Sequence, residues 1–384
     1  MPNPSPFLDL PPYPADGYAR LADRMGRLLR TRNDVLPVQG EAIIALEAVA
    51  ASIASPDVVA LNVVTSPYGK LFGEWLRRGG SAVTDLAAEP PGPISLAAFQ
   101  AAFDADPGAN LVSLVHAESA SGILNPLPEI ARLAKARGAT IVLDAVASFG
   151  GHVLDIDGLG IDIAVIGPQK ALGGSSGLSA VSISETAWRL IDRPDAPVNS
   201  TLSLMDLKRD WLDTGRGVLP GMPSALEFFA LEAALDRIET EGLDATVARH
   251  GKAGMATRDA VRALGLSTSA KDASSSDLVT AAMLPEGVDV ADLLRRVTSA
   301  GVDLSAGVGP GAERLLRLNH TGQRARREPV LANILAVGQA LSALGLNVNL
   351  NAANAAIDRH YGADYPQRTW SSRRLHSSRS NSAS

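Results

Sequence analysis

Residues 140–177 read TIVLDAVASFGGHVLDIDGLGIDIAVIGPQKALGGSSG and contain two strand-like runs, each followed by a polar residue. Ile141–Leu143 is continuously apolar, as is typical of a strand buried on both faces of a parallel sheet, and Asp144 follows it. The second run, 161–166, leads into a glycine-rich loop that carries Lys170. In open α/β sheets, ligands bind beyond the carboxyl ends of the strands. The segment therefore predicts an α/β fold in which Asp144 and Lys170 lie beside a ligand.

Asp144 and Lys170 suit the chemistry of pyridoxal 5′-phosphate. A lysine amine can bond to the aldehyde of this cofactor as a Schiff base. A carboxylate paired with the pyridinium nitrogen keeps the ring able to accept electrons. The spacing of the two residues equally allows a surface lysine and an aspartate that caps a helix, so the spacing alone leaves both interpretations open.

Five motifs resemble those of the class V aminotransferases, a family of fold type I enzymes that use pyridoxal 5′-phosphate. Two of them, DAVASFGG and GPQKALGG, lie in the segment quoted above. The others are GEAIIALEA at 40–48, YGKLFG at 68–73 and RLNHTG at 317–322. Over residues 30–345 the chain is most similar to the branch that includes the pyridoxamine–pyruvate and the alanine– and serine–glyoxylate aminotransferases. This implies a large domain with a mostly parallel central sheet flanked by helices, and a smaller C-terminal α+β domain.

The resemblance also implies which residues contact the cofactor. Tyr68 would stack on one face of the pyridine ring, and Val146 would pack on the other. Ser119, in the HAESASG loop at 116–122, would contact the phenolic oxygen, and Gln169 would bind the phosphate. A core tyrosine is the alternative for Tyr68. The full implied set of contacts is Glu41, Ala42, Ile43, Tyr68, Ser119, Asp144, Val146, Gln169 and Lys170.

Two further roles concern the substrate. The resemblance makes Lys170 the general base as well as the cofactor's anchor, with Asp144 as the second catalytic residue. Arg317 would bind the substrate carboxylate, because a guanidinium is a planar, two-pronged donor that matches a carboxylate. An ordinary ion pair is the alternative for Arg317.

Glu41 departs from the family pattern at the expected phosphate site. The turn at 39–41 leads into an expected helix at 42–55, and the unpaired N–H groups of a helix N-terminus favour a phosphate. By resemblance, the backbone at Glu41, Ala42 and Ile43 would hold that phosphate. Many relatives have serine or threonine in place of Glu41. Because a carboxylate beside a phosphate is costly, we expect the Glu41 side chain to point toward substrate. The alternative is an exposed glutamate that complements the helix dipole.

Three other departures leave the reaction open. Leu219 and Met222 stand where relatives have residues that touch the partner subunit's phosphate, and neither can donate a hydrogen bond. Val308 stands near the position of an arginine found in the pyridoxamine–pyruvate branch.

Amino transfer to a 2-oxo acid is the first hypothesis for the reaction. A C–S lyase (β-elimination) or decarboxylating deaminase acting on a cysteine S-conjugate in secondary metabolism is the second. A non-catalytic binding protein is the third, and the combination of Lys170 with Asp144 argues against it.

Composition excludes several other classes. The 384 residues contain no cysteine, which excludes disulfides, zinc–thiolate sites and a cysteine nucleophile. A net charge of −6 gives no basic surface for nucleic acid, and no metal-ligand spacing is present among the histidines. No apolar run is long enough to span a membrane, so we expect a cytoplasmic protein without membrane contact. By analogy with fold type I enzymes, we expect a homodimer with its active sites at the interface and a small amino-acid substrate.

The chain divides into four expected parts. A proline-rich N-terminal arm covers 1–15, the large cofactor-binding domain 16–254, and the small domain 255–350. Residues 351–384 are rich in serine and arginine and are expected to be a disordered tail. A single long helix is expected over 224–250.

Overall fold

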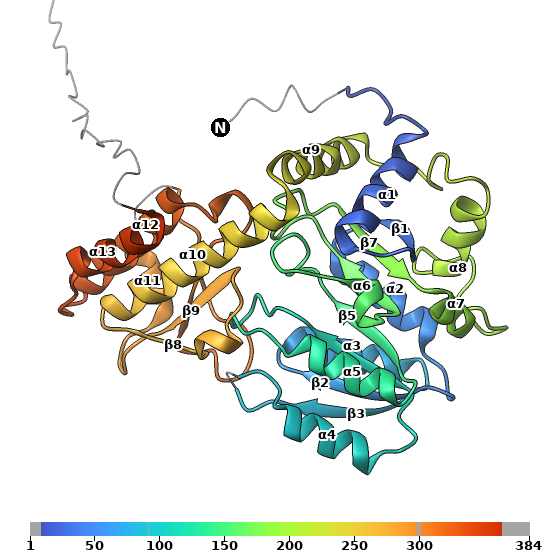
Figure 1. The fold of residues 1–384 in the computed structure, drawn as a ribbon, viewed down its shortest axis with the longest axis horizontal. Helices are drawn as coiled ribbons and strands as arrows, with labels where there is room; N and C mark the ends of the chain where they lie inside the picture. The colour runs from blue at the N-terminus through green and yellow to red at the C-terminus, as the bar shows by residue number, and fades with distance from the viewer. Residues whose placement is uncertain (1–8, 91, 298–300, 363–384) are drawn as a thin grey trace, which may run out of the picture.

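The computed structural model describes residues 9–90, 92–297 and 301–362 and shows a large and a small domain (Figure 1). The large domain is built on a seven-stranded sheet in the order β1-β7-β6-β5-β4-β2-β3. Only β7 runs antiparallel to its neighbours; the other pairings are parallel. The mostly parallel sheet predicted from the sequence is therefore confirmed. The strands are β1 (Asp34–Gln39), β2 (Val59–Val64), β3 (Ala82–Ala87), β4 (Leu111–Val115), β5 (Thr140–Asp144), β6 (Ile163–Ile166) and β7 (Leu178–Ile183).

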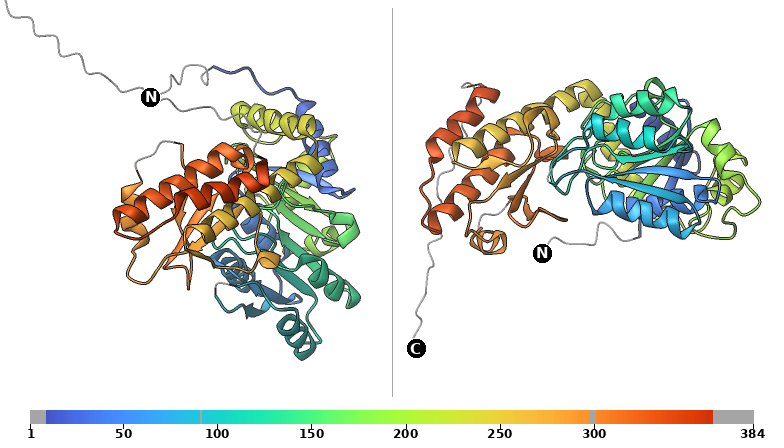
Figure 2. Two further views of the ribbon diagram at one scale, coloured as in Figure 1. Left: turned by 60° about the vertical axis from the view of Figure 1, so that its left-hand side comes forward. Right: turned by 90° about the horizontal axis from the view of Figure 1, so that it is seen from below.

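Helices cover both faces of this sheet (Figure 2). On one face α2 packs against α3, and on the other α4 packs against α5. The residues of β4, β6 and β7 are buried along their whole length, as expected for strands covered on both faces. The helices of the large domain are α1 (Gly17–Leu29), α2 (Ala42–Ile53), α3 (Pro67–Arg78), α4 (Leu96–Ala105), α5 (Leu127–Ala136), α6 (Ile156–Leu159), α7 (Glu185–Ile191), α8 (Leu204–Leu207), the adjoining turn η2 (Lys208–Leu212) and α9 (Ala225–Glu241).

The small domain has its own sheet and its own apolar core. Its four strands are antiparallel in the order β10-β11-β9-β8. The elements are α10 (Leu243–Ala263), β8 (Ser267–Thr268), η3 (Asp272–Ser274), β9 (Val279–Met283), α11 (Val290–Arg296), β10 (Leu304–Ala306), β11 (Leu315–Asn319), η4 (Gly322–Arg324), α12 (Arg327–Ala343) and α13 (Leu350–Tyr361). The smaller α+β domain is thus present as predicted, and α10 runs from the large domain into it (Figure 1).

The long helix expected at 224–250 is two helices. The chain breaks between α9 and α10 at Gly242, whose φ of 88° lies outside the helical region and is easily adopted only by glycine. The boundary predicted at residue 254 falls inside α10, so one continuous helix contributes to both domains.

The tail predicted from residue 351 does not begin there. Residues 351–361 belong to α13, which packs on α10 and α12. Ala353, Ala356 and Ile357 recur at helical spacing and are buried, so this apolar stripe outweighs the polar composition of the segment. The remainder of the predicted tail, 363–384, lies outside the described residues, as does most of the predicted N-terminal arm. Among the helices that the structure describes, none has the length and apolar character needed to cross a bilayer.

Candidate active site

Asp144 lies at the carboxyl end of β5, as the sequence predicted. The register pairs it with Val115 of β4 and Val165 of β6, so it lies between two parallel neighbours in the interior of the sheet. Its Oδ1 accepts the backbone N–H of Val146 at 2.9 Å. Burial raises the pKa of Asp144 to about 6; Glu41 contributes to this rise, while the Val146 N–H and Lys170 oppose it. Asp144 and Lys170 therefore share one electrostatic environment.

Lys170 lies in a cavity of about 230 Å³ between the two domains' segments. Ser119, Gln169 and Arg317 line the same cavity, so four residues predicted separately from the sequence are brought together. The other lining residues are Ala147, Ser276, Leu278, Val279, Asp303, Asn319 and Thr321. Most of these come from the small domain. Asn319 and Thr321 belong to the RLNHTG motif, whereas no motif in the sequence pointed to Ser276, Leu278, Val279 or Asp303.

Arg317 approaches this cavity from β11. Its Nε donates to the carbonyl of Ala306 at 2.7 Å, and its Nη1 donates to the carbonyl of Ser119 at 2.6 Å. Half-burial lowers the pKa of Arg317, but the guanidinium stays protonated. Among the described residues, no carboxylate is hydrogen-bonded to this guanidinium. The two backbone bonds fix the guanidinium plane, so the alternative of an ordinary ion pair is not what the structure contains.

Tyr68 lies at the start of α3, whose N-terminus Ser66 caps by accepting the Tyr68 N–H. Its side chain is exposed, so it is not the core tyrosine considered as an alternative. Tyr68 and Asp144 line a separate, small cavity of about 10 Å³. Val146 is partly buried against the main core.

Glu41 occupies the N-terminus of α2. It is the N-cap residue, and its Oε2 accepts the backbone N–H of Ile43 at 2.9 Å. Its Oε1 accepts the side-chain amide of Gln169 at 2.6 Å. Glu41 thus caps its own helix, as in the dipole alternative, and its second oxygen is bonded to Gln169, a residue of the Lys170 cavity.

Two buried residues of the HAESASG loop were quoted from the sequence but given no role. Burial raises the pKa of Glu118 to about 7; Thr65 donates to its Oε1 at 2.6 Å, and its Oε2 has no partner among the described residues. Burial lowers the pKa of His116 to about 3, and its ring lies 5.5 Å from that of His152. The sequence contained one signal for this loop: His116 is a polar residue directly after a buried strand, as Asp144 is after the apolar run at 141–143.

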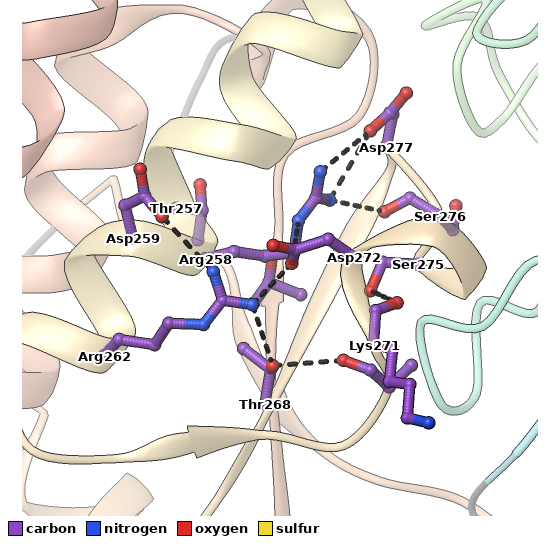
Figure 3. Close-up of polar contacts among 12 residues, drawn as sticks. Thr257, Arg258, Asp259, Arg262, Thr268, Lys271, Asp272, Ser275, Ser276 and Asp277 are labelled. Carbon is purple, nitrogen blue, oxygen red and sulfur yellow. Dashed lines mark hydrogen bonds and ion pairs between the residues drawn. The ribbon is translucent and has the colours of Figure 1, made fainter.

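A polar network on α10 holds one wall of the cavity (Figure 3). The buried Arg258 contacts the carbonyl of Ser276 and the carboxylate of Asp277, each at 3.4 Å, and pairs with Asp272 at 3.3 Å. Arg262 bonds to Asp272 as well. These contacts tie the segment 272–277 to α10, and Ser276 thereby lies at the cavity wall.

The three departures from the family pattern lie in different environments. Leu219 is buried in the core of the large domain, whereas Met222 is 97% exposed. Val308 is exposed, and its backbone N–H lies 3.4 Å from the carbonyl of Ala120. Neither Leu219 nor Met222 has a side chain that could donate a hydrogen bond to a phosphate.

Known proteins match this chain in sequence and in structure. The family model for class V aminotransferases matches residues 71–322. Pyridoxamine–pyruvate transaminase of Mesorhizobium japonicum is 36% identical over 89% of this chain and 88% of its own length. The crystal structure of pyridoxamine–pyruvate aminotransferase from Mesorhizobium loti superposes with a TM-score of 0.86 at 34% identity, covering 91% of this chain and 90% of that one. Alanine–glyoxylate aminotransferase from Nostoc sp. gives a TM-score of 0.81 at 26% identity, covering 88% and 92%.

Proposed function

Since this chain belongs to the class V aminotransferase family, whose members depend on pyridoxal 5′-phosphate, we propose that its cavity transfers an amino group from an amino-acid or amine donor to a small 2-oxo acid. The observation that supports this most directly is the placement of Lys170 and Arg317 in one cavity of about 230 Å³. An amine and a fixed guanidinium there can address the two ends of an amino or oxo acid.

The ring end of the site fits the cofactor. Asp144 is a carboxyl at a strand end, its pKa is raised by burial, and Lys170 lies within its electrostatic reach, which suits a pyridinium nitrogen. Tyr68 lines the small cavity that also contains Asp144, and Ser119 lies on the wall shared with Lys170. Val146, which is partly buried against the core, is proposed to cover the second face of the ring. When bound, pyridoxal 5′-phosphate supplies an electron-withdrawing ring that stabilises negative charge on the substrate carbon next to the nitrogen.

The roles of the protein's own residues follow from their chemistry. Lys170 would hold the cofactor through its Nζ, and the same Nζ would remove and return a proton at the substrate carbon. Asp144, in its ionised form, would pair with the ring nitrogen and favour its protonated state. Arg317, with two of its N–H groups already fixed by backbone carbonyls, orients the substrate carboxylate without reorganising.

The acceptor is proposed from the size of the cavity and the names of the relatives. Pyridoxamine–pyruvate transaminase and alanine–glyoxylate aminotransferase are named after pyruvate and glyoxylate, both small 2-oxo acids. Purified protein should convert one of these to alanine or glycine with a panel of amines and amino acids as donors. Release of a thiol and pyruvate from a cysteine S-conjugate, without amino transfer to any acceptor, would instead establish the lyase alternative.

We expect Arg317→Gln to raise KM for the oxo-acid acceptor by roughly 10- to 100-fold, because a charge-assisted, two-pronged contact is lost. Steady-state kinetics with pyruvate or glyoxylate would measure this change. Arg314→Gln is the matched control, since Arg314 lies in the same segment but bonds to the carbonyl of Leu284 instead of lining the cavity. An unchanged KM in Arg317→Gln would remove this residue from the substrate site.

We also propose that the protein is a cytoplasmic homodimer, with each active site completed at the interface. Large apolar side chains are exposed on the segments beside the site, including Ile44 at the start of α2, Tyr68 and Met222. The loop that carries Met222 contacts the end of β1, because the side chain of Gln39 donates to the Pro220 carbonyl at 3.1 Å. Sedimentation equilibrium should give twice the monomer mass. A monomer that retains full activity at the same concentration would contradict the proposal.

A further inference from the structure

Gly322, the last residue of the RLNHTG motif, lies against the loop that carries Lys170. A Cβ atom added at Gly322 would lie 3.1 Å from the Cα of Gly173 and 3.3 Å from the carbonyl oxygen of Lys170. The φ of Gly322 is 56°, in the left-handed region that favours glycine. The small domain therefore meets the backbone of the Lys170 loop at a point that is close in the chain to Arg317.

Two consecutive residues of α10 hold both backbone polar groups of Gly322. The N–H of Gly322 donates to Nε2 of the buried His250 at 3.0 Å, and Nη1 of Arg249 donates to the carbonyl of Gly322 at 2.6 Å. The other ring nitrogen of His250 lies 2.8 Å from the Thr246 carbonyl, which can only accept a hydrogen bond, so this nitrogen carries a proton. Burial lowers the pKa of His250 to about 4, and Nε2 of the neutral ring is therefore an acceptor.

Arg249 also joins the two helices that meet at the Gly242 break. Its Nε and Nη2 donate to the two carboxylate oxygens of Glu241, the last residue of α9, at 2.5 and 2.9 Å. The side chains of Arg249 and Glu241 are only 14% and 25% exposed, so solvent screens this two-pronged pair less than a surface pair. One guanidinium thus links the junction between α9 and α10 to the position of Gly322.

The loop that carries Lys170 is attached to α9. Nη2 of Arg237, on that helix, donates to the carbonyl of Gly173 at 2.6 Å. The motif that begins with Arg317 is attached to α10 through Gly322. Because Lys170 and Arg317 line the same cavity, the relative position of the two helices affects the separation between these two side chains.

We propose that Arg249 is a positioning residue that sets the separation between Lys170 and Arg317, and that it thereby restricts the acceptor to acids whose oxo group is adjacent to the carboxylate. Arg249 does not line the cavity, so it acts through Gly322 and through the junction of α9 with α10. The inference rests on the proposed function, because it assumes that Lys170 faces the reacting carbon and Arg317 the carboxylate. It goes beyond that function by naming a residue outside the cavity that determines which oxo acids fit.

The test compares kcat/KM for pyruvate with kcat/KM for 4-oxobutanoate, whose carboxylate lies two carbons further from the oxo group. The wild type should prefer pyruvate. In Arg249→Gln the preference should fall by about tenfold or more, because a misplacement of roughly 1 Å at a reacting group can cost on the order of 10²-fold. Arg249→Lys keeps a charged donor for the Gly322 carbonyl and should recover part of the preference. A ratio measured on one preparation does not depend on the fraction of folded protein.

Arg327→Gln is the matched control for the loss of an ion pair. Arg327 pairs with Asp358 between α12 and α13, and their side chains are 10% and 29% exposed, so the pair is buried to a similar extent and also joins two helices. Neither residue lines the cavity. Arg327→Gln should lower the melting temperature about as much as Arg249→Gln does and should leave the preference for pyruvate unchanged.

Gly322→Ala changes the same separation without touching the ion pair. The added methyl group would crowd the Lys170 loop, so the preference for pyruvate should fall as it does in Arg249→Gln. Gly345→Ala is the control for backbone strain. Gly345 also has a positive φ, 82°, but within the described part of the chain a Cβ atom there would meet open space. The preference should be unchanged in Gly345→Ala.

An unchanged preference in both Arg249→Gln and Gly322→Ala would overturn the inference. An equal fall in Arg327→Gln would overturn it as well, since any loosened ion pair would then have the same effect. If the wild type transfers an amino group to neither acid, the proposed function itself fails and the inference fails with it. The two kinds of failure are distinguishable, because the first is seen only in an active wild-type protein.

Discussion

Lys170→Ala is expected to lose amino-transfer activity by at least about 10³-fold, the largest effect of any single substitution proposed for this protein. The reason is that Lys170 has two proposed roles, and the substitution removes both. The variant has no amine to bond to the aldehyde carbon, and it has no general base at the substrate carbon. The visible absorbance of lysine-bound aldehyde should also be absent, which gives a readout that does not depend on turnover.

Lys271→Ala is the matched control for this substitution, because Lys271 is an exposed lysine on the segment before η3 and does not line the cavity. It should retain both the absorbance and the activity of the wild type. Thermal unfolding of Lys170→Ala should match the wild type, so that a folding defect is separated from a chemical one. Full activity in Lys170→Ala would contradict the assignment of the cavity as the active site.

Asp144→Asn is expected to lower kcat on the order of 10²- to 10³-fold, because an ionised carboxylate at the pyridinium nitrogen is replaced by a neutral amide. The expected pH dependence follows from the raised pKa. Burial raises the pKa of Asp144 from its usual value of 3.8 to about 6 in the ligand-free protein, so the carboxylate form predominates above this value and the neutral form below it. Ligand binding by the wild type should therefore weaken as the pH falls through about 6.

The measurement is the dissociation constant of the aldehyde ligand between pH 5 and 8, for wild type and Asp144→Asn. The variant should bind more weakly and should lack the wild-type weakening near pH 6. Asp155→Asn is a control in which an aspartate that caps α6 is neutralised at a distance from the cavity. The same acid limb in wild type and Asp144→Asn would show that another group is responsible, and Glu118, with a pKa raised to about 7, would be the first to consider.

The sequence alone determined the fold class, because its evidence is local. The continuous apolar run Ile141–Leu143 is typical of a strand buried on both faces, and Asp144, which follows the run, is the residue at which the structure ends β5. The strand-end rule then placed Asp144 and Lys170 on one edge of the sheet without knowledge of the strand order. The family motifs added Ser119, Gln169 and Arg317, which the structure brings into one cavity with Lys170.

The choice between helix and tail at residues 351–361 depended on a pattern that composition obscures. Ala353, Ala356 and Ile357 form a helical stripe, but three small or medium side chains stabilise a helix only when a partner covers them. The partners are α10 and α12, which the sequence does not place. The break at Gly242 was available from the sequence, since a glycine in a helical run lowers helix propensity by about 1 kcal/mol, but one glycine does not by itself distinguish a break from a tolerated residue.

Only the tertiary structure decided where the side chain of Glu41 points and what surrounds Lys170. Sequence reasoning identified Glu41 as unusual from its residue type, but the direction of a side chain depends on donors that the fold brings close, here the N–H of Ile43 and the amide of Gln169, 128 residues away. The small-domain wall of the cavity, with Ser276, Asp303 and Asn319, is likewise assembled from segments remote from Lys170 in the chain. A local sequence pattern predicts secondary structure because it reflects the periodic burial of side chains. The residues that line a site between domains depend on long-range packing, which no local pattern contains.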